Sequence, residues 1–346
     1  MSAPLTTDDD RLLVGLDERA TDGVFDRFYV NLHGEGPDTL LLFGGGVYPA
    51  AGIVDAWLIA AVGGVQRNVR FSTQIAVDAG PDDIAGIGPF AWSCPEPGQR
   101  WRFDLGANLS GIELHADLVG RLPMFGYRRL EFESTERHTS FDHAVQSGRW
   151  DGSVSVDGEG VDITGWWGQR DRSRGVRGMH AGQGIHLWMQ PQFEDWQVSL
   201  MYDESREGEP ALCDGAVIGA DGVTDPIVAV EHELLADSGQ ELQTLRLRLK
   251  TTSGRTVDLA GECTGVGGPY LQGGGYDGRH GTWQGLDHQS GERWVLGDGR
   301  LGPRTLRTPY AHRLTRFTHE GDVGWGVTEF AMTRHPQYRY RATLRS

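Results

Sequence analysis

The segment Gly165–Gly178, GWWGQRDRSRGVRG, lies near the middle of the 346-residue chain and is its most informative stretch. Its arginines Arg170, Arg172 and Arg174 are two residues apart. In a β-strand, side chains two residues apart point to the same face, and the residues between them point to the other. The segment therefore predicts a strand with an arginine face on one side and Asp171 on the other.

Short runs of alternating apolar and polar residues, separated by glycine-rich turns, continue this pattern in both directions along the chain. Asp157-Gly158 between two such runs is a strong hairpin signal. About fifteen to twenty strands at this spacing are typical of a sandwich or a barrel. The predicted strands are Phe25–Leu32, Leu40–Phe43, Arg100–Leu105, Gly111–Val119, Ser153–Val156, Val161–Gly165, Gly184–Met189, Gln197–Met201, Ile227–Leu235, Glu241–Leu249, Thr256–Glu262, Gly324–Met332 and Tyr338–Leu344.

Helices are expected to be few. The only candidate segments are Asp8–Leu16 and Thr135–Gln146, and neither has a strong helical pattern. Since long helices do not alternate with the strands, a parallel α/β sheet is not expected. The predicted fold class is all-β.

The length of the chain favours two domains of about 150 to 180 residues, with one large β domain as the alternative. The glycine-rich stretch Gly175–Gly184 is the predicted boundary. It divides the chain into an N-terminal unit of residues 1–180 and a C-terminal unit of residues 181–346. A barrel of about eight to ten strands can hold one apolar ligand, and several of the eleven tryptophans lie near glycines where they could line such a cavity.

The formal net charge of −16 argues against non-specific binding to nucleic acids and to anionic membrane surfaces. The N-terminal sequence MSAPLTTDDDRLL has no basic region followed by an apolar run, so no signal peptide is expected. The apolar stretch Ile53–Val62 is too short to span a bilayer. The oligomeric state stays open.

Candidate metal ligands are sparse in this sequence. Cys94, Cys213 and Cys263 are far apart and lack CxxC spacing, so neither a disulfide framework nor a zinc site is predicted. His180 and His186 could share one strand face, but two histidines alone make a poor metal site. We therefore expect no metal and a cytoplasmic protein with reduced thiols.

Three guanidinium groups on one strand face repel one another unless negative charge lies opposite them. One interpretation is an ion-paired network with some of the 48 carboxylates of the chain. The other is a bidentate clamp for a carboxylate, phosphate or enolate oxygen of a ligand. Asp171 would be a buried acid if its face lines the cavity, and Arg177 falls out of phase in the turn that follows.

This segment resembles the signature of the hydroxyneurosporene-synthase and carotenoid 1,2-hydratase-like superfamily, a group with two lipocalin-like barrels. That signature reads roughly G-x-G-x-R-D-H-S-W-G-x-R, and the first glycine pair is one residue wider apart here. A late glycine–aromatic–Glu element that includes Trp325 and Glu329 is also similar. The matching residues of the central segment are Gly165, Gly168, Arg170, Asp171, Ser173, Gly175 and Arg177.

The resemblance implies two lipocalin-like antiparallel barrels packed side by side, with an apolar pocket between or within them. It also implies chemistry on terpenoid-like or polycyclic ligands, either the addition of water to an isoprenoid double bond or a pericyclic cyclisation, without a metal or organic cofactor. The residues Tyr202 and Asp203 resemble a Tyr/Asp pair downstream of the family signature.

The chain departs from the family at two positions, because Arg172 and Arg174 stand where the family has His and Trp. An arginine is not a useful proton donor at neutral pH, and it would repel a carbocation. The hydratase mechanism therefore does not carry over unchanged, and the acid candidates that remain are Asp171 and Asp203. A carboxylic acid that protonates an alkene needs a raised pKa, which an apolar cavity can supply.

Three functional hypotheses follow. The first is a cofactor-independent lyase, hydratase, isomerase or cyclase acting on a hydrophobic small molecule, with catalytic candidates Asp171, Asp203 and Tyr202. The second is a non-catalytic carrier of an amphipathic, anionic ligand, and the third is a structural protein whose arginines pair only with its own acids. The expected substrate-binding residues are Arg170, Arg172, Arg174, Arg177, Trp166, Trp188, His186, Trp325 and Glu329.

Overall fold

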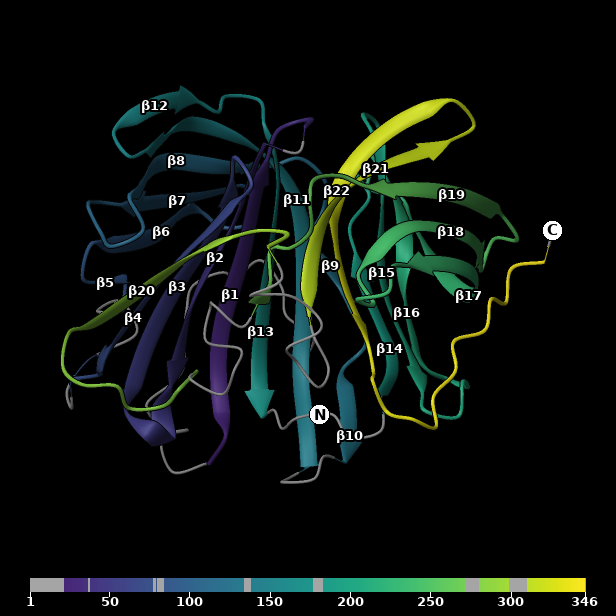
Figure 1. Ribbon diagram of the computed structural model, residues 1–346, viewed down its shortest axis with the longest axis horizontal. Helices are drawn as coiled ribbons and strands as arrows, with labels where there is room; N and C mark the ends of the chain where they lie inside the picture. The colour runs from purple at the N-terminus through teal and green to yellow at the C-terminus, as the bar shows by residue number, and fades with distance from the viewer. Residues whose placement is uncertain are drawn as a thin grey trace.

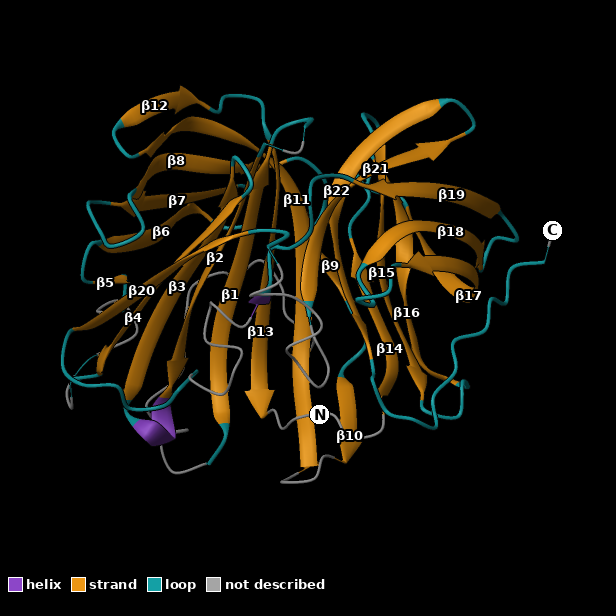
Figure 2. Ribbon diagram, viewed as in Figure 1, coloured by secondary structure: helices purple, strands orange, loops and turns teal. Residues whose placement is uncertain are grey.

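The computed structural model describes residues 22–36, 38–76, 79, 84–133, 138–176, 183–271, 280–298 and 310–345. In this part of the chain, strands form almost all of the regular structure, and helical structure is confined to short 3₁₀ turns such as η3 (Pro49–Ala51) (Figure 2). The predicted all-β fold class is thus confirmed.

The first half of the chain, together with β20 from the second half, forms a 14-stranded antiparallel sheet that curls around its own core. Its main path runs β20-β4-β3-β2-β1-β13-β11-β8-β7-β6-β5, and β9, β10 and β12 also pair with the long strand β11. The strands are β1 (Val24–His33), β2 (Thr39–Tyr48), β3 (Ile53–Val62), β4 (Val65–Gln74), β5 (Gly86–Ile87), β6 (Phe90–Glu96), β7 (Arg100–Leu105), β8 (Ile112–Gly120), β9 (Phe125–Gly126), β10 (Leu130–Glu133), β11 (His138–Val156), β12 (Glu159–Asp162), β13 (Trp167–Val176) and β20 (His288–Val295).

The second half forms a closed antiparallel barrel of eight strands. Figure 1 shows it beside the curled sheet, with β1, β13 and β11 running down the middle of the molecule. The barrel strands are β14 (Gln183–Met189), β15 (Trp196–Ser205), β16 (Pro210–Gly219), β17 (Thr224–Ala236), β18 (Leu242–Thr251), β19 (Thr256–Cys263), β21 (Ala311–His319) and β22 (Asp322–Met332). The prediction of two lipocalin-like β units is confirmed, with the first unit a curled sheet and the second a closed barrel.

The three largest apolar clusters among the described residues follow from the alternation of side chains between the two faces of these strands. On β1, Phe28 and Val30 point into the core of the curled sheet, whereas Phe25 and Tyr29 point out of it. The barrel has its own interior core, which is built on residues such as Leu187 of β14. The outward faces of β1, β13 and β11 pack against the outward faces of β14, β15, β21 and β22, and this third cluster joins the two units.

The predicted hairpin at Asp157-Gly158 is present between β11 and β12. Both residues have positive φ, 51° at Asp157 and 90° at Gly158, as a two-residue turn of the primed type requires. Asp157 also accepts two hydrogen bonds from the guanidinium group of Arg67, at 2.6 and 2.8 Å. This turn is therefore tied to strand β4.

Two of the predicted elements are wrong. The helix candidate Thr135–Gln146 is part of strand β11 from residue 138 onward, because pairing with β13 and β10 overrides its weak helical pattern. The predicted strand Tyr338–Leu344 is irregular. Its alternation arises because Tyr338 and Tyr340 pack on the core of the barrel, while its backbone makes isolated hydrogen bonds such as that from Thr343 to His232. The other helix candidate, Asp8–Leu16, lies outside the described residues.

The predicted boundary lies between β13, the last strand of the curled sheet's continuous run, and β14, the first strand of the barrel. One strand crosses the division, since β20 from the C-terminal half pairs with β4 along the edge of the first sheet. The division into residues 1–180 and 181–346 stays a proposal. Within the described residues, no helix has the length and apolarity needed to cross a membrane.

Candidate active site

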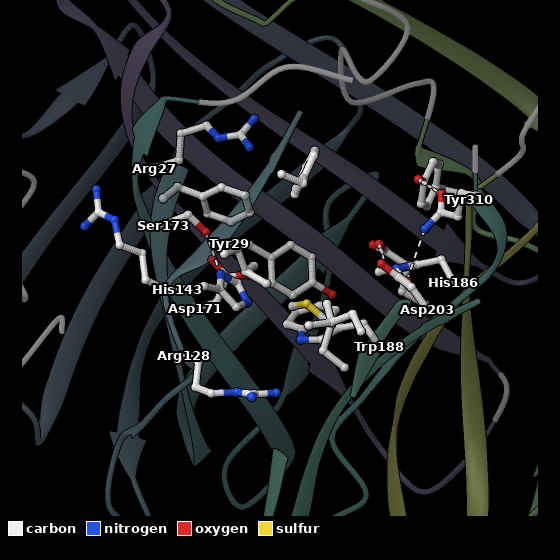
Figure 3. A pocket seen from close by; sticks show the side chains of 18 of the residues that line it. Arg27, Tyr29, Arg128, His143, Asp171, Ser173, His186, Trp188, Asp203 and Tyr310 are labelled. Atoms are coloured by element: carbon white, nitrogen blue, oxygen red, sulfur yellow. Dashed lines mark hydrogen bonds and ion pairs between the residues drawn. The ribbon is translucent and has the colours of Figure 1, made fainter. Parts of the chain in front are cut away.

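A cavity of about 430 Å³ lies where the curled sheet meets the barrel. Its aromatic lining comes from both units, with Tyr29, Trp57 and Phe141 on the sheet side and Trp188 on the barrel side. Figure 3 shows two polar groups of residues on either side of Tyr29. The cavity is thus between the two units and not inside either one.

The sheet side of the cavity is set by the register of three neighbouring strands. Asp171 of β13 is directly opposite Tyr29 of β1, so the two side chains lie on the same face. Ser173 is opposite both Arg27 and His143, and its Oγ lies 2.7 Å from His143 Nδ1. All five residues line the cavity.

The barrel side carries a hydrogen-bonded acid–base cluster. His186 of β14 lies between two carboxylates, with Nδ1 2.6 Å from Asp203 Oδ1 and Nε2 2.9 Å from Glu329 Oε1. Gln183 Nε2 donates a further hydrogen bond of 3.1 Å to Asp203 Oδ1, and Tyr310 Oη donates one of 2.9 Å to Gln183 Oε1. These polar side chains hold one another in place on the barrel wall of the cavity.

The cluster continues across the boundary between the units. Glu329 Oε2 forms a short hydrogen bond with Nε2 of His312, a residue of β21 that is 1% exposed. The other ring nitrogen, His312 Nδ1, lies 2.9 Å from the hydroxyl oxygen of Tyr29 on β1. Asn31 Nδ2 donates to the same hydroxyl oxygen at 3.3 Å and to Gln169 Oε1 at 3.1 Å. A continuous polar path therefore joins the barrel wall to the sheet wall.

The electrostatics of the cluster favour a charged His186. Burial disfavours the imidazolium form, but Asp203 and Glu329 outweigh that effect and raise the pKa of His186 to about 10. For Glu329, burial opposes ionisation, but the adjacent His312 and His186 lower the pKa of the carboxyl well below its usual value. At neutral pH, His186 is thus an imidazolium ion that lies between Asp203 and Glu329.

Five of the residues predicted from the sequence meet in this cavity. Asp171 is on the sheet wall, and the other four are on the barrel wall: His186, Trp188, Asp203 and Glu329. The Asp171 face of β13 does line the cavity. The opposite face of the same strand, which carries the arginines, does not.

The arginines point into the core region of the curled sheet, where they have partners from the protein itself. Arg172 is 1% exposed and forms a bidentate ion pair with the fully buried Asp26. Arg174 Nε lies 3.4 Å from the same carboxylate, and Arg170 donates to Gln146 Oε1 at 2.7 and 3.0 Å. The ion-paired network fits this geometry, whereas a ligand clamp would require these groups to line the cavity.

Three other predicted residues also lie away from the cavity. Tyr202 points into the barrel, where its hydroxyl donates a 3.2 Å hydrogen bond to Glu204 and where burial raises its pKa. Trp166 packs against the core of the curled sheet, and Trp325 packs in the cluster between the units. Arg177 lies outside the described residues.

Several residues of the site are absent from the sequence-based predictions, notably Tyr29, Trp57, His143 and His312. The alternating stretch Phe25–Leu32 contained a signal for Tyr29, because it places this residue on the face opposite Phe28. No sequence pattern marks His312, which is 283 positions away from the hydroxyl group that it contacts. Within the described chain, no group of three or more His, Cys, Asp and Glu side chains is arranged to hold a metal ion.

Several solved structures share this fold. A candidate AttH from Nitrosomonas europaea superposes with a TM-score of 0.62 at 14% identity, covering 96% of this chain and 100% of that one. Kievitone hydratase from Nectria haematococca has a TM-score of 0.52 at 10% identity, covering 96% of each chain. At these identities the likeness shows the fold alone.

Comparison of the sequence with known proteins and family models gives the family of the chain. The search of curated proteins found no match. A family model described as "Family of unknown function (DUF8625)" matches residues 14–336, which is well over half of the chain. The chain therefore belongs to this family of unknown function.

Proposed function

We propose that the protein is a cofactor-independent enzyme of the lyase or isomerase type, which moves protons to and from a hydrophobic substrate in the cavity between its two units. The observation that carries this proposal is the position of Asp171. Its carboxyl group faces an aromatic cavity whose opposite wall holds the cluster of His186, Asp203 and Glu329. A cavity needed only for storage would not require ionisable groups on both walls.

Asp171 is the proposed general acid. In its carboxylic acid form it would give a proton to a carbon–carbon double bond of the substrate, and the resulting cation would lie against the faces of Tyr29 and Trp188. The second acid candidate, Asp203, has a different role in this proposal. Its Oδ1 accepts hydrogen bonds from both His186 and Gln183, so Asp203 positions the barrel wall and does not transfer the proton itself.

The shape and lining of the cavity define the proposed substrate class. A volume of about 430 Å³ with Trp57, Phe141 and Trp188 in its walls suits a hydrophobic molecule of terpenoid-like or polycyclic size. Kievitone hydratase has a similar fold, and a hydratase adds water to a double bond. Hydration and cyclisation both begin from such an alkene, and both belong to the proposed reaction class. The three cysteines form no disulfide with one another, which fits the proposed cytoplasmic location.

The test is proton incorporation from solvent. The wild-type protein is incubated in D₂O with a panel of isoprenoid alkenes and linear polyenes, and the products are analysed by mass spectrometry for deuterium bound to carbon. Asp171→Asn should lower the rate of incorporation about 10²-fold or more, since an amide cannot replace a general acid. Binding of the same compounds, measured by native mass spectrometry, should change little.

Asp151→Asn is the matched control, because Asp151 is an exposed aspartate of β11 outside the cavity, and its rate should equal that of the wild type. If Asp171→Asn retains the wild-type rate, Asp171 is not the acid. If the wild-type protein binds members of the panel but never incorporates deuterium, the carrier hypothesis replaces the enzyme hypothesis.

A further inference from the structure

Three residues from both units form one hydrogen-bonded line that ends in the cavity. Glu329 of β22 contacts His312 Nε2 of β21, and His312 Nδ1 lies 2.9 Å from the hydroxyl of Tyr29 on β1. Glu329 and Tyr29 line the cavity, whereas His312 is buried behind it. The ring of Tyr29 is fixed by edge contacts with both His312 and Trp188, at centroid distances of 5.3 and 5.6 Å.

The donor and the acceptor in each of these two hydrogen bonds follow from the carboxylate of Glu329, which stands at one end of the line. A carboxylate group can only accept hydrogen bonds, so in its contact with Glu329 Oε2 His312 carries a proton on Nε2. A neutral imidazole with a proton on Nε2 has a lone pair on Nδ1. In that tautomer Nδ1, which lies 2.9 Å from the hydroxyl oxygen of Tyr29, accepts the hydroxyl proton of Tyr29.

We infer that Tyr29, His312 and Glu329 form a proton-transfer triad in which Tyr29 is the general base of the site. This inference rests on the proposed function, because it supplies the group that removes a proton while Asp171 supplies one. The arrangement has the logic of other catalytic triads: a buried carboxylate orients an imidazole, which in turn activates a hydroxyl group. Here the three residues come from two different structural units.

The protons balance in a hydration. Asp171 gives one proton to an alkene carbon and becomes a carboxylate, and the neighbouring carbon becomes a cation. Water forms the new C–O bond and gives its proton to the oxygen of Tyr29, as the hydroxyl proton of Tyr29 passes to His312 Nδ1. Exchange with solvent then returns a proton from His312 to Asp171. In a cyclisation, the second proton leaves a carbon of the substrate instead of water.

Asp171 and Tyr29 can act on one bound molecule because they are directly opposite each other across β13 and β1. His186 and Asp203 serve as positioning residues, since His186 holds Glu329 Oε1 at 2.9 Å while Glu329 Oε2 holds His312. The titratable and charged groups that face the triad or share its cavity are Arg27 on β1, Arg128, Arg129, Glu131 on β10, His143 on β11, Asp171 on β13, His186 on β14, Asp203 on β15 and Tyr310.

The first test needs no substrate. The protein is labelled with ¹⁵N-histidine, and the tautomer of His312 is read from two-bond ¹H–¹⁵N correlations at pH 7.5. The expected state is a protonated Nε2 and an unprotonated Nδ1 that accepts a hydrogen bond, with an Nδ1 shift that changes in Tyr29→Phe. A protonated Nδ1, in the other tautomer or in an imidazolium ion, would overturn the triad.

The second test measures deuterium incorporation by variants of the triad. Tyr29→Phe and His312→Gln should each lower the rate about 10²-fold or more, and the double variant should be no slower than the single ones, because residues that act as a unit are not additive. Tyr127→Phe is the matched control. Tyr127 is also buried between the units, but its hydroxyl bonds to Ser199 and Gln190 outside the cavity, and its rate should stay near that of the wild type.

The two tests separate this inference from the proposed function. A wild-type rate in Tyr29→Phe overturns the triad and leaves Asp171 as a valid acid. If no compound is turned over by the wild type, the proposed function fails, while the tautomer of His312 still decides whether the triad is assembled. If His312→Gln does not fold, the rate of Tyr29→Phe still tests the triad. Phenylalanine keeps the ring that packs against Trp188, so this variant is expected to fold.

Discussion

At the scale of single residues, the arginines of β13 show how a prominent sequence feature can be structural. Arg172 and Asp26 are both almost fully buried, and each neutralises a charge that would otherwise be very costly inside the curled sheet. The register of β1 and β13 places Phe28 opposite Arg172 and Asp26 opposite Arg174, so the acid lies between the two cations. The arginine signature of the sequence therefore marks the core region of the first unit, and the cavity belongs to the residues between the arginines.

This pairing makes a prediction about stability. Arg172→Met should lower the free energy of unfolding by about 3–5 kcal/mol, because it leaves the carboxylate of Asp26 buried without its bidentate partner. The double variant Arg172→Met, Asp26→Leu should recover much of the loss, since neither charge of the pair remains. Urea denaturation measures both values. A double variant that loses as much as the sum of its two single variants would show that the pair is not coupled.

At the scale of the element, β13 is a strand whose two faces have different tasks. Its Asp171 face is part of the cavity wall, and its other face packs in the curled sheet. The motif glycine Gly168 lies where the strand passes the indole ring of Trp150, which donates a 3.0 Å hydrogen bond to the carbonyl of Asn31. A Cβ atom at position 168 would lie 2.3 Å from Trp150 Nε1. Gly168 is thus required for close packing, independently of any ligand.

Gly168→Ala should therefore destabilise the protein by about 1–3 kcal/mol, the usual cost of overpacking a core. Gly160→Ala on strand β12 is the control, because position 160 is exposed and a Cβ atom there would have no neighbour within 4 Å. Its effect should be within about 0.5 kcal/mol. Thermal unfolding followed by circular dichroism compares the two variants, and equal melting temperatures would contradict the packing role of Gly168.

At the scale of the whole molecule, the histidines link folding to pH. His186 lies where the barrel meets the sheet, and its pKa is raised to about 10 because Asp203 and Glu329 outweigh the effect of burial. Its contribution to stability is complete below about pH 6.5, the ordinary pKa of histidine, and is lost as the pH rises to about 10.

His33 has the opposite effect on stability, because burial lowers its pKa to about 4. As the pH drops, His33 takes up a proton in the unfolded chain at a higher pH than it does in the folded protein. The free energy of unfolding therefore falls between about pH 6.5 and 4.

His186→Gln should accordingly flatten the alkaline limb of a plot of unfolding free energy against pH. The wild type should lose stability between about pH 6.5 and 10, with about 5 kcal/mol as the ceiling for this one group. His33→Asn is the matched control: it should reduce the slope between about pH 6.5 and 4 and leave the alkaline limb unchanged. If the alkaline limbs of the wild type and His186→Gln are parallel, His186 does not gain its charge from the two carboxylates.

The sequence by itself determined the all-β class, most of the strands and the two faces of β13, because these depend on a local period of two. That period also placed Asp171 opposite the arginines, so the acid candidate could be named before any contact was known. The composition could not show which face of β13 meets the second unit, because both faces carry charged and polar residues.

Only the tertiary structure decided that the cavity lies between the curled sheet and the barrel, and that the arginines turn away from it. The pairing of Arg172 with Asp26 and of Tyr29 with His312 joins residues 146 and 283 positions apart. Such contacts arise from the order of strands in a sheet and from the packing of two sheets, and no local pattern encodes either. The position of the proposed acid therefore follows from strand alternation, and that of the proposed base follows from the way the two units meet.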